Sequence, residues 1–336
     1  MSRRGHSVAI VAPREARIHE AALKRGLNAE ALPITGKNLT GFLAMRRWLK
    51  VHTVDVINTH SSTDSWLAAL ACATVAQAPA IVRTRHISAP VPNNLPTRWL
   101  YSRATRHIVT TGETLRMQLV RDNRLPFERI TSVPTGIDAT RFVPGERDAA
   151  RRLTGLPAGS RLIGIVATLR SWKGHRYLLE ALHGLPDDVG LVIVGDGPQR
   201  QNIETRILEL GLRERTWLAG NQDDVLSWLQ ALNVFALPSY ANEGVPQALV
   251  QAMLCGLPCV TTAAGGIGEI ARDGETAIAV KSEDAADLRR GLERALGDAK
   301  LCERLGTAAR QYCAANFGVE TMLDRMEKVF RDVAHA

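Results

Sequence analysis

Short apolar runs alternate with longer amphipathic stretches along the first half of the chain. The runs are rich in Val, Ile and Ala and end in polar segments, which is typical of buried strands. Strands that alternate with helices predict a parallel sheet covered by helices. The predicted strands are 8–12 (a buried one), 54–58, 80–84, 107–110 and 130–133, and the predicted helices are 65–76, 99–104 and 113–121.

The same alternation starts again after residues 138–160, a segment rich in Arg, Pro and Gly. Such a segment is typical of a linker, so we expect a second α/β domain after it. Residues 283–336 have a helical pattern almost throughout. The predicted fold class is therefore α/β, with two doubly wound, Rossmann-like domains. The strands predicted for the second domain are 162–167, 190–194, 216–219, 234–237 and 259–262, and the helices are 176–182, 199–210, 223–232 and 247–254.

Basic residues are concentrated in the first half. Residues 1–144 hold 20 Lys and Arg against 9 Asp and Glu, a net charge of +11, and residues 145–336 hold 22 against 25, a net charge of −3. A basic domain suits nucleic acid, an anionic membrane surface or an anionic substrate. The sequence has no nucleic-acid motif and no aromatic residues interleaved with the basic ones, which argues against nucleic acid. We expect an anionic membrane surface as the partner; an ordinary solvated surface is the alternative.

The cysteines and the apolar runs indicate the compartment. Five cysteines are scattered without the paired spacing of a metal site. Single cysteines of this kind are typical of a reducing compartment. No apolar run approaches the ~18 residues of a membrane span. These observations predict a cytoplasmic protein, peripheral on the membrane at most.

The segment 237–269 has the most specific pattern of the chain. A predicted strand, a polar loop and a helix follow one another, and a Gly-Gly pair follows the next strand. In α/β folds, loops that lead from the carboxyl ends of parallel strands into helices bind phosphorylated ligands. Proline at the first helical position removes a donor that has no partner there. The positions with this potential are Glu243, Gly244, Val245, Pro246, Gly265 and Gly266.

This segment resembles the donor-binding signature of the family 4 glycosyltransferases, which are retaining, nucleotide-sugar-dependent enzymes of GT-B fold. Their pattern is Pro-Ser, then Glu-Gly-x-Pro, then a second Glu eight positions after the first. Glu243 matches the first acid, and Gln251 stands at the second. The resemblance implies that Glu243 contacts the donor sugar hydroxyls and that position 251 bonds the nucleotide ribose. Because an amide lacks the carboxylate charge, we expect donor choice or affinity to differ.

The segment 165–174 resembles the Gly-Arg-Leu-x-x-x-Lys-Gly loop of the same family. Lys173 matches the family's Lys, whereas Thr168 stands at the family's Arg and Arg170 lies two positions later. The resemblance implies that Lys173 neutralises the donor diphosphate and that Arg170 reaches it by another route. It also implies transfer without a metal or a cofactor. The loop whose backbone would lie near the donor sugar and phosphate is Gly265, Gly266 and Ile267.

Two histidines of the first domain are candidate catalytic residues. His60 follows the strand at 54–58 and His86 follows the strand at 80–84, so both fall on the ligand-binding side of the sheet. The family carries a functional His after the corresponding strand, facing the donor sugar. We favour His86 and keep His60 as second; a neutral imidazole would hold a sugar hydroxyl. Alternatively, His86 and its neighbours Arg83 and Arg85 would bind an anionic acceptor.

The resemblance covers almost the whole chain and predicts two domains that face a cleft. The expected boundaries are 1–145 for the acceptor-side domain, 146–317 for the donor domain, and 318–336 for a helix that crosses back to the first domain. Family members begin with a strand, a Gly-Gly loop and a helix ending near Arg-Gly-His, whereas this chain opens at Arg4. We therefore expect the first domain to lack its first strand and loop, through a late start or a shortened, inactive form.

The predicted function is retaining transfer of a sugar from a nucleotide-diphosphate sugar to a glycan or lipid-linked acceptor, as in lipopolysaccharide synthesis. Gln251 and the missing loop favour the alternative of a non-catalytic nucleotide-sugar binder. A GT-B sugar epimerase is a further alternative that the match at Glu243 disfavours. The candidate membrane contacts are Arg46, Arg47, Arg103 and Arg106, with Trp48 and Trp99 nearby, because apolar rings beside cations suit an interface.

Overall fold

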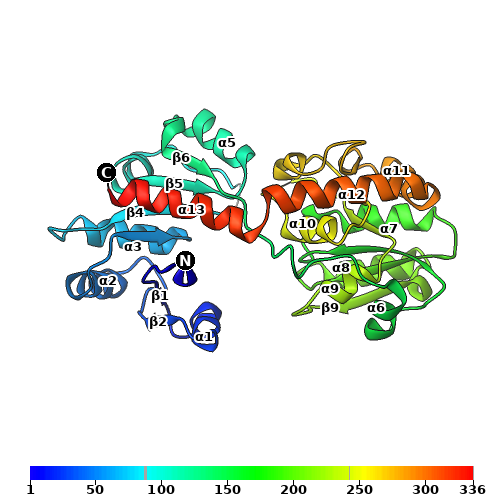
Figure 1. Cartoon of the computed structure of the whole chain (residues 1–336), viewed down its shortest axis with the longest axis horizontal. Helices are drawn as coiled ribbons and strands as arrows, with labels where there is room; N and C mark the ends of the chain where they lie inside the picture. Colours follow the sequence, from blue (N-terminus) through cyan, green and yellow to red (C-terminus); the bar gives the residue numbers. More distant parts are fainter. Residues whose placement is uncertain (87–88, 242, 336) are drawn as a thin grey trace. The chain divides into compact units, whose positions relative to one another are not determined.

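Two units of parallel α/β structure make up the chain in the computed structural model, which describes residues 1–86, 89–241 and 243–335 (Figure 1). Unit 1 is Met1–Val133 together with Met322–Ala336, and unit 2 is Pro134–Thr321. Unit 2 has one parallel sheet and unit 1 has two, and helices pack on the larger sheet of each unit. The predicted class of two Rossmann-like domains is confirmed.

Unit 2 contains a six-stranded parallel sheet in the order β12-β11-β10-β7-β8-β9. Its central strands are continuous runs of Val, Ile and Leu because helices cover both faces, and every residue of β8 is buried. The strands are β7 (Arg161–Val166), β8 (Val189–Val194), β9 (Thr216–Gly220), β10 (Val234–Leu237), β11 (Cys259–Thr261) and β12 (Ile278–Ala279). The helices are α6 (Arg147–Thr154), α7 (His175–His183), α8 (Arg200–Glu209), α9 (Leu226–Gln230), α10 (Gln247–Leu254), α11 (Ala285–Gly297) and α12 (Ala299–Asn316), with 3₁₀ turns η4 (Ser171–Lys173), η5 (Arg213–Arg215) and η6 (Gly265–Glu269).

The direction of winding in unit 2 reverses between two neighbouring strands. From β7 the chain moves outward to β8 and β9, and then returns to β10 on the other side of β7. In the β7–β10 pair, Val234 lies beside Ile163 and Phe235 beside Gly164. The crevice outside the carboxyl ends of two such strands is where open α/β sheets bind their ligands. The segments that follow β7 and β10 are therefore the first place to look for a site.

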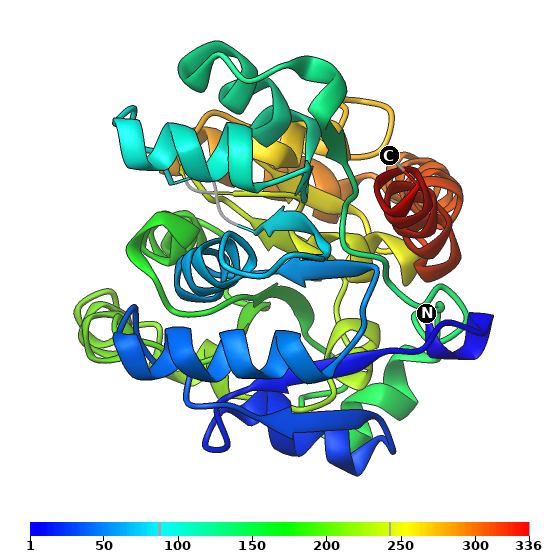
Figure 2. The same cartoon turned by 90° about the vertical axis from the view of Figure 1, so that its left-hand side faces the viewer.

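Unit 1 contains two parallel sheets, a pair β1-β2 and a four-stranded sheet β3-β4-β5-β6, and no ladder joins them in the described part of the chain. Within the larger sheet, alternate residues face opposite helical layers. Ile81 and Ile108 pack under one layer, and Val82 and Val109 pack against α13 (Val319–Ala334) on the other face (Figure 2). The strands are β1 (Ala9–Ala12), β2 (Asn28–Ala31), β3 (Val56–Thr59), β4 (Ala80–Arg85), β5 (His107–Thr110) and β6 (Ile130–Ser132). The helices are α1 (Arg17–Lys24), α2 (Leu39–Val51), α3 (Ser62–Cys72), α4 (Leu95–Trp99), the π-helical turn η2 (Leu100–Ala104) and α5 (Glu113–Asn123), with 3₁₀ turns η1 (Ser2–Arg4) and η3 (Phe127–Arg129).

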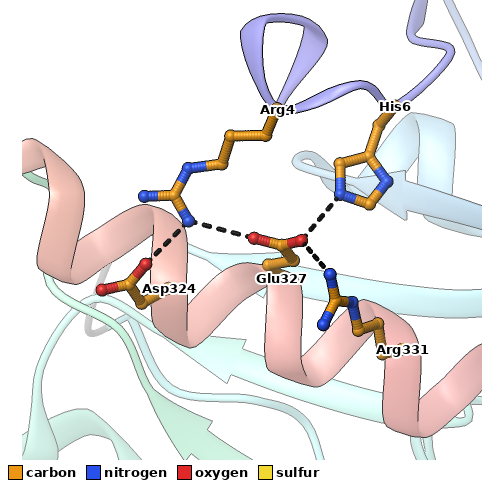
Figure 3. Close-up of polar contacts among 5 residues, drawn as sticks. All are labelled: Arg4, His6, Asp324, Glu327 and Arg331. Atoms are coloured by element: carbon orange, nitrogen blue, oxygen red, sulfur yellow. Dashed lines mark hydrogen bonds and ion pairs between the residues drawn. The ribbon is translucent and has the colours of Figure 1, made fainter.

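A polar cluster holds the start of the chain against α13 (Figure 3). Glu327 accepts hydrogen bonds from His6 at 3.0 Å, Arg4 at 3.0 Å and Arg331 at 2.6 Å. Arg4 also pairs with Asp324 at 2.7 Å. The hydrogen bonds from His6 and then Arg4 lower the pKa of Glu327, because they favour its charged form. The first and last segments of the sequence thus stabilise one another within unit 1.

Three details differ from the sequence-based expectations. The strand at 8–12 was expected to be buried, but within β1 only Ala12 is, because β1 has a single partner strand. Strand β2 and helices α1 and α2 lie outside the predicted elements. Strand β2 was missed because Asn28–Ala31 lacks an apolar run. Pro246 was expected at the first helical position, but it is the N-cap residue of α10, in extended conformation, one position before the helix.

Candidate functional site

The loops that follow β7 and β10 meet at the point where the winding of unit 2 reverses. Lys173 ends the 3₁₀ turn η4, which follows β7, and Glu243 lies in the loop between β10 and α10. Lys173 Nζ donates to Glu243 Oε1 at 2.6 Å. The two side chains are 18% and 5% exposed. Two residues that sequence analysis selected separately thus form one mostly buried ion pair.

Close backbone packing explains the glycines around this pair. A Cβ atom on Gly265 would lie 2.3 Å from the carbonyl oxygen of Glu243, and one on Gly266 would lie 2.6 Å from the carbonyl carbon of Gly244. The Gly266 N–H also donates to the Glu243 carbonyl at 3.0 Å. Gly174 has φ of 76°, and a Cβ there would lie 2.1 Å from the carbonyl oxygen of Pro238. These glycines therefore hold the loop of Glu243 in place, a role that the sequence pattern did not reveal.

The remaining residues of the expected donor site surround the pair at different depths. Pro246 is buried, Gly244 and Val245 are half-buried, and Gln251 is half-buried within α10. Among the described residues no side chain caps the start of α10, where the first helical N–H groups have no intrahelical partner. Ile267 is fully buried at 0% exposure and belongs to the core of unit 2.

The loop before Lys173 presents a second cation to solvent. Arg170 is exposed, and its guanidinium lies 5.6 Å from the ring centroid of Trp172. The carbonyl of Trp172 accepts from the Tyr240 N–H at 2.9 Å, which joins the loop after β7 to the loop after β10. Ser239, one residue before Tyr240, is fully buried, and its hydroxyl has no hydrogen-bond partner in the described residues. This edge of the sheet thus combines two cations with an unsatisfied donor group.

His175 lies directly beneath this loop, at the start of α7. Its side chain is only 3% exposed. Burial, and then the positive charge of Lys173, lowers the pKa of His175 to about 4. The imidazole is therefore neutral at pH 7 and acts as part of the core that supports Lys173.

The two candidate histidines of unit 1 lie in contact with each other. His60 follows β3 and His86 follows β4, and these strands are neighbours in the sheet. Nδ1 of His60 lies 3.0 Å from Nε2 of His86, and the rings stack with centroids 5.3 Å apart. Burial lowers the pKa of both groups, and the charge of His86 lowers that of His60 further, against the opposing effect of Asp64. The pair is neutral at pH 7, so one ring donates to the other.

The basic surface of unit 1 differs in part from the expected one. Trp48 donates to Glu30 at 2.8 Å and stacks on His52, and Arg46 donates to Thr74 at 3.1 Å. Trp48 and Arg46 thus have partners within unit 1, whereas both were expected to be available for a membrane contact. The exposed stripe of α2 consists instead of Leu39, Leu43, Arg47 and Lys50, spaced at helical intervals. Trp99 stacks on Trp66 with centroids 6.1 Å apart.

Arg103 and Arg106 lie elsewhere on unit 1. Together with Arg129 and Trp99, they line a cavity of about 930 Å³ beside the amino-terminal ends of β3, β4 and β5. No helix in the described ranges is long and apolar enough to cross a membrane.

Comparison with known families covers both units. Residues 1–141 match the family model described as "Glycosyltransferase Family 4", and residues 146–312 match the one described as "Glycosyl transferases group 1". The two matches leave only residues 142–145 and 313–336 outside them. The chain therefore belongs to the family 4 and group 1 glycosyltransferases, and the expected family is confirmed.

Relatives and solved structures agree with this assignment. The UDP-Gal:alpha-D-GlcNAc-diphosphoundecaprenol alpha-1,3-galactosyltransferase of Escherichia coli is 24% identical over 88% of this chain and 80% of its own length. The chain spans 52% and 59% of two further curated relatives. The structure of Anabaena HepE in complex with UDP has a TM-score of 0.86 at 19% identity and covers 96% of this chain and 92% of its own. WaaG, a glycosyltransferase involved in lipopolysaccharide biosynthesis, has a TM-score of 0.70 at 18% identity and covers 99% of this chain and 92% of its own. These likenesses show that the chain has the GT-B fold.

Proposed function

We propose that this chain is a retaining glycosyltransferase that takes a sugar from a uridine diphosphate sugar and transfers it to a lipid-linked glycan of the cell envelope. The observation that carries the proposal is the Lys173–Glu243 pair at the reversal point between β7 and β10. A cation and a carboxylate at this edge are what a sugar diphosphate requires, one for its phosphates and one for its hydroxyls. The UDP in the similar Anabaena structure and the UDP-Gal named for the E. coli relative support the choice of nucleotide.

The diphosphate would be bound by positive charge supplied by the protein itself. Lys173 is the fixed cation, Arg170 is an exposed one that can reach a bound phosphate, and the uncapped start of α10 offers backbone N–H groups. When the bond between the sugar and the diphosphate breaks, negative charge builds up on the leaving oxygen. Preorganised cations lower the energy of that charge, because they need no reorganisation during the reaction.

The transfer itself would take place on one face of the sugar. The acceptor hydroxyl oxygen forms a bond to the anomeric carbon as the bond to the diphosphate oxygen breaks, and the hydroxyl proton passes to the departing diphosphate. The products are the glycoside, with its configuration retained, and UDP. Glu243 would hold donor sugar hydroxyls during this step. Within unit 1, the neutral His86, supported by His60, is the residue proposed to hold a sugar hydroxyl. Gln251 would accept from a ribose hydroxyl.

The acceptor is proposed to be reached from the cytoplasmic face of the membrane. The acceptor in the name of the E. coli relative carries a diphosphoundecaprenol, and WaaG acts in lipopolysaccharide synthesis. The net charge of +11 on residues 1–144 suits an anionic lipid surface, and the α2 stripe places Leu39 and Leu43 beside Arg47 and Lys50. Peripheral docking through unit 1 would bring the enzyme to a lipid-linked substrate.

One observation favours a second candidate, a nucleotide-sugar binder without transfer activity. Gln251 stands where the family has its second acid, so a charged hydrogen bond to the ribose is lost. Incubation of the protein with a panel of UDP-sugars and lipid-extract acceptors, with UDP release as the readout, separates the two. UDP release that requires both donor and acceptor supports the enzyme, whereas UDP binding without turnover of any donor supports the binder.

A further inference from the structure

Arg83 is a buried cation for which the described part of the chain supplies no counter-charge. It lies in the central strand β4, its side chain is only 6% exposed, and in the described residues it forms no ion pair. Its Nε and Nη1 atoms are buried and have no hydrogen-bond partner among the residues that the structure describes. The guanidinium lies 4.8 Å from the ring centroid of Tyr101, so its described contact is with an aromatic face.

A second guanidinium reaches the same tyrosine. Because side chains alternate along a strand, Arg85 projects to the same face of the sheet as Arg83. Arg85 Nη1 donates to the Tyr101 hydroxyl at 2.8 Å, and Nη2 donates to the Ala89 carbonyl at 2.6 Å. Two positive charges therefore converge on Tyr101 from one strand. The layer around them is apolar and includes Ile81, Leu100 and Ile108.

The burial of these charges costs folding free energy unless a further group pairs with them. A buried charge that is neither paired nor fully hydrogen-bonded loses its hydration without replacement, and an aromatic ring compensates only in part. A low-dielectric surrounding strengthens the attraction for any anion that enters. The planar fork of a guanidinium matches the two oxygens of a phosphate or a carboxylate. Arg83 thus has the free donors and the environment of an oxyanion receptor.

We propose that Arg83 and Arg85 bind an anionic group, a phosphate or a carboxylate, on the acceptor. Arg83 would donate to the oxyanion from its unpaired guanidinium N–H groups, and Arg85 would add the second charge. Both residues precede His86 at the carboxyl end of β4, the edge where parallel sheets bind ligands. The proposal rests on the proposed function, since it assigns an anionic acceptor to the same enzyme.

The test uses the full chain with its donor site filled. UDP binding is measured first, and the melting temperature is then followed in saturating UDP as inorganic phosphate, methyl phosphate or acetate replaces chloride at constant ionic strength. We expect the wild type to be stabilised by the oxyanion, because a ligand that binds only the folded state raises its melting temperature. Phosphate and acetate arms distinguish a phosphate-bearing acceptor from a carboxylate-bearing one. A wild type that responds to neither contradicts the proposal.

Arg83→Met is the decisive variant, with Arg98→Met on the exposed surface of α4 as its control. Arg83→Met should lose the response to oxyanions and should melt higher than wild type in chloride, because it removes an unpaired buried charge and keeps the apolar stem. Arg98→Met should behave as wild type. If Arg83→Met melts lower and still responds to phosphate, Arg83 is a structural cation and the proposal is wrong.

Arg83→Lys keeps the charge and removes the fork, so it remains informative if the methionine variant fails to fold. Its affinity for phosphate should fall roughly tenfold, which corresponds to one charged hydrogen bond lost. Unchanged affinity in Arg83→Lys contradicts the proposal. The failure of the two hypotheses can be told apart: no UDP binding by the wild type contradicts the donor site, whereas UDP binding with an unaltered oxyanion response in the Arg83 variants contradicts the acceptor site alone.

Discussion

Lys173 Nζ lies 2.6 Å from Glu243 Oε1, although 70 residues separate the two in the sequence. The contact exists because β7 and β10 are neighbours, and each residue lies in the segment that follows its strand. Glu243 is almost fully buried, so Lys173 is its counter-charge in the absence of a ligand. Removal of one partner of such a pair typically costs about 3–5 kcal/mol, because the other charge stays buried and unpaired. A bound diphosphate would draw Lys173 toward the phosphates and leave Glu243 available to the sugar.

Glu243→Gln should abolish transfer and leave the fold intact. The amide still accepts a hydrogen bond from Lys173, but it loses the charge that would hold the donor sugar hydroxyls. UDP should bind at least as tightly as in wild type, because Lys173 is released from a charged partner. UDP release with donor and acceptor, calorimetry with UDP and the melting temperature measure the three effects. Near-normal transfer would show that Glu243 is not a catalytic residue; the exposed Glu293→Gln is the matched control.

His175→Leu should remove a pH dependence of stability. The pKa of His175 is about 4 in the folded protein, against 6.5 in the unfolded chain. The unfolded chain therefore takes up a proton first as the pH falls. The free energy of unfolding should be unaffected by this group above pH 6.5. It should fall by about 3 kcal/mol between pH 6.5 and 4, at 1.36 kcal/mol for each pKa unit.

Urea unfolding at pH 7.5 and at pH 4.5 measures this difference. The exposed His183→Gln, in the same helix, is the control and should keep the wild-type pH dependence. An equal loss of stability on acidification in His175→Leu and wild type would assign the dependence to other groups.

His86→Asn should raise the pKa of His60. Burial is the main cause of the lowered pKa of His60, and the charge of His86 is the second. Without His86 the second cause disappears, and the opposing attraction of Asp64 remains. Titration of the His60 ring proton by NMR measures the change. The pKa values of both histidines are lowered in the folded protein, so the unfolded chain binds protons first as the pH falls. The two histidines therefore lower the free energy of unfolding only below about pH 6.5. A His60 pKa that does not move in His86→Asn would show that the two rings are not coupled in solution.

Binding to vesicles should require anionic lipid and should fall steeply with ionic strength. Each basic side chain near an anionic surface contributes roughly 1 kcal/mol, and salt screens that attraction. Arg47→Glu, on the exposed stripe of α2, should weaken binding by more than about fivefold. Arg213→Glu in unit 2 changes the net charge equally and should have a smaller effect. Equal partitioning onto neutral and anionic vesicles, or onto neither at low salt, would favour a soluble acceptor.

Local pattern predicted much of the fold. The bounds of β5, β10 and α10 are those expected, because continuous apolar runs and a helical period between clear turn signals leave little choice. Strand β2 was missed because its polar residues pair with a single neighbour. The histidine pair and the receptor-like position of Arg83 depend on which strands are adjacent and on which face a side chain lies. Spacing along the chain selected His60, His86 and Arg83 as candidates, but it gives neither the contact between the two rings nor the burial of Arg83.

The donor site shows the same limit of prediction from sequence. The signature residues Lys173 and Glu243 were recognised one by one, but their contact follows from the strand order. The glycines at 265 and 266 were expected to let a ligand approach, whereas their neighbours in the structure are the backbone atoms of Glu243 and Gly244. Composition cannot distinguish a glycine that admits a ligand from one that admits another loop, because both need the absence of a Cβ.

The most direct test of the account is calorimetric titration of UDP into wild type and Lys173→Ala. The loss of a hydrogen bond to a charged group predicts binding weaker by about 1.5–3 kcal/mol, or roughly ten- to 150-fold. Because Lys173→Ala leaves Glu243 unpaired, the double variant Lys173→Met with Glu243→Gln serves as a control, which should regain stability but not UDP affinity. Weak UDP binding in both variants, with a folded double variant, is the result that the account predicts. UDP affinity equal to wild type in Lys173→Ala would place the diphosphate elsewhere and contradict it.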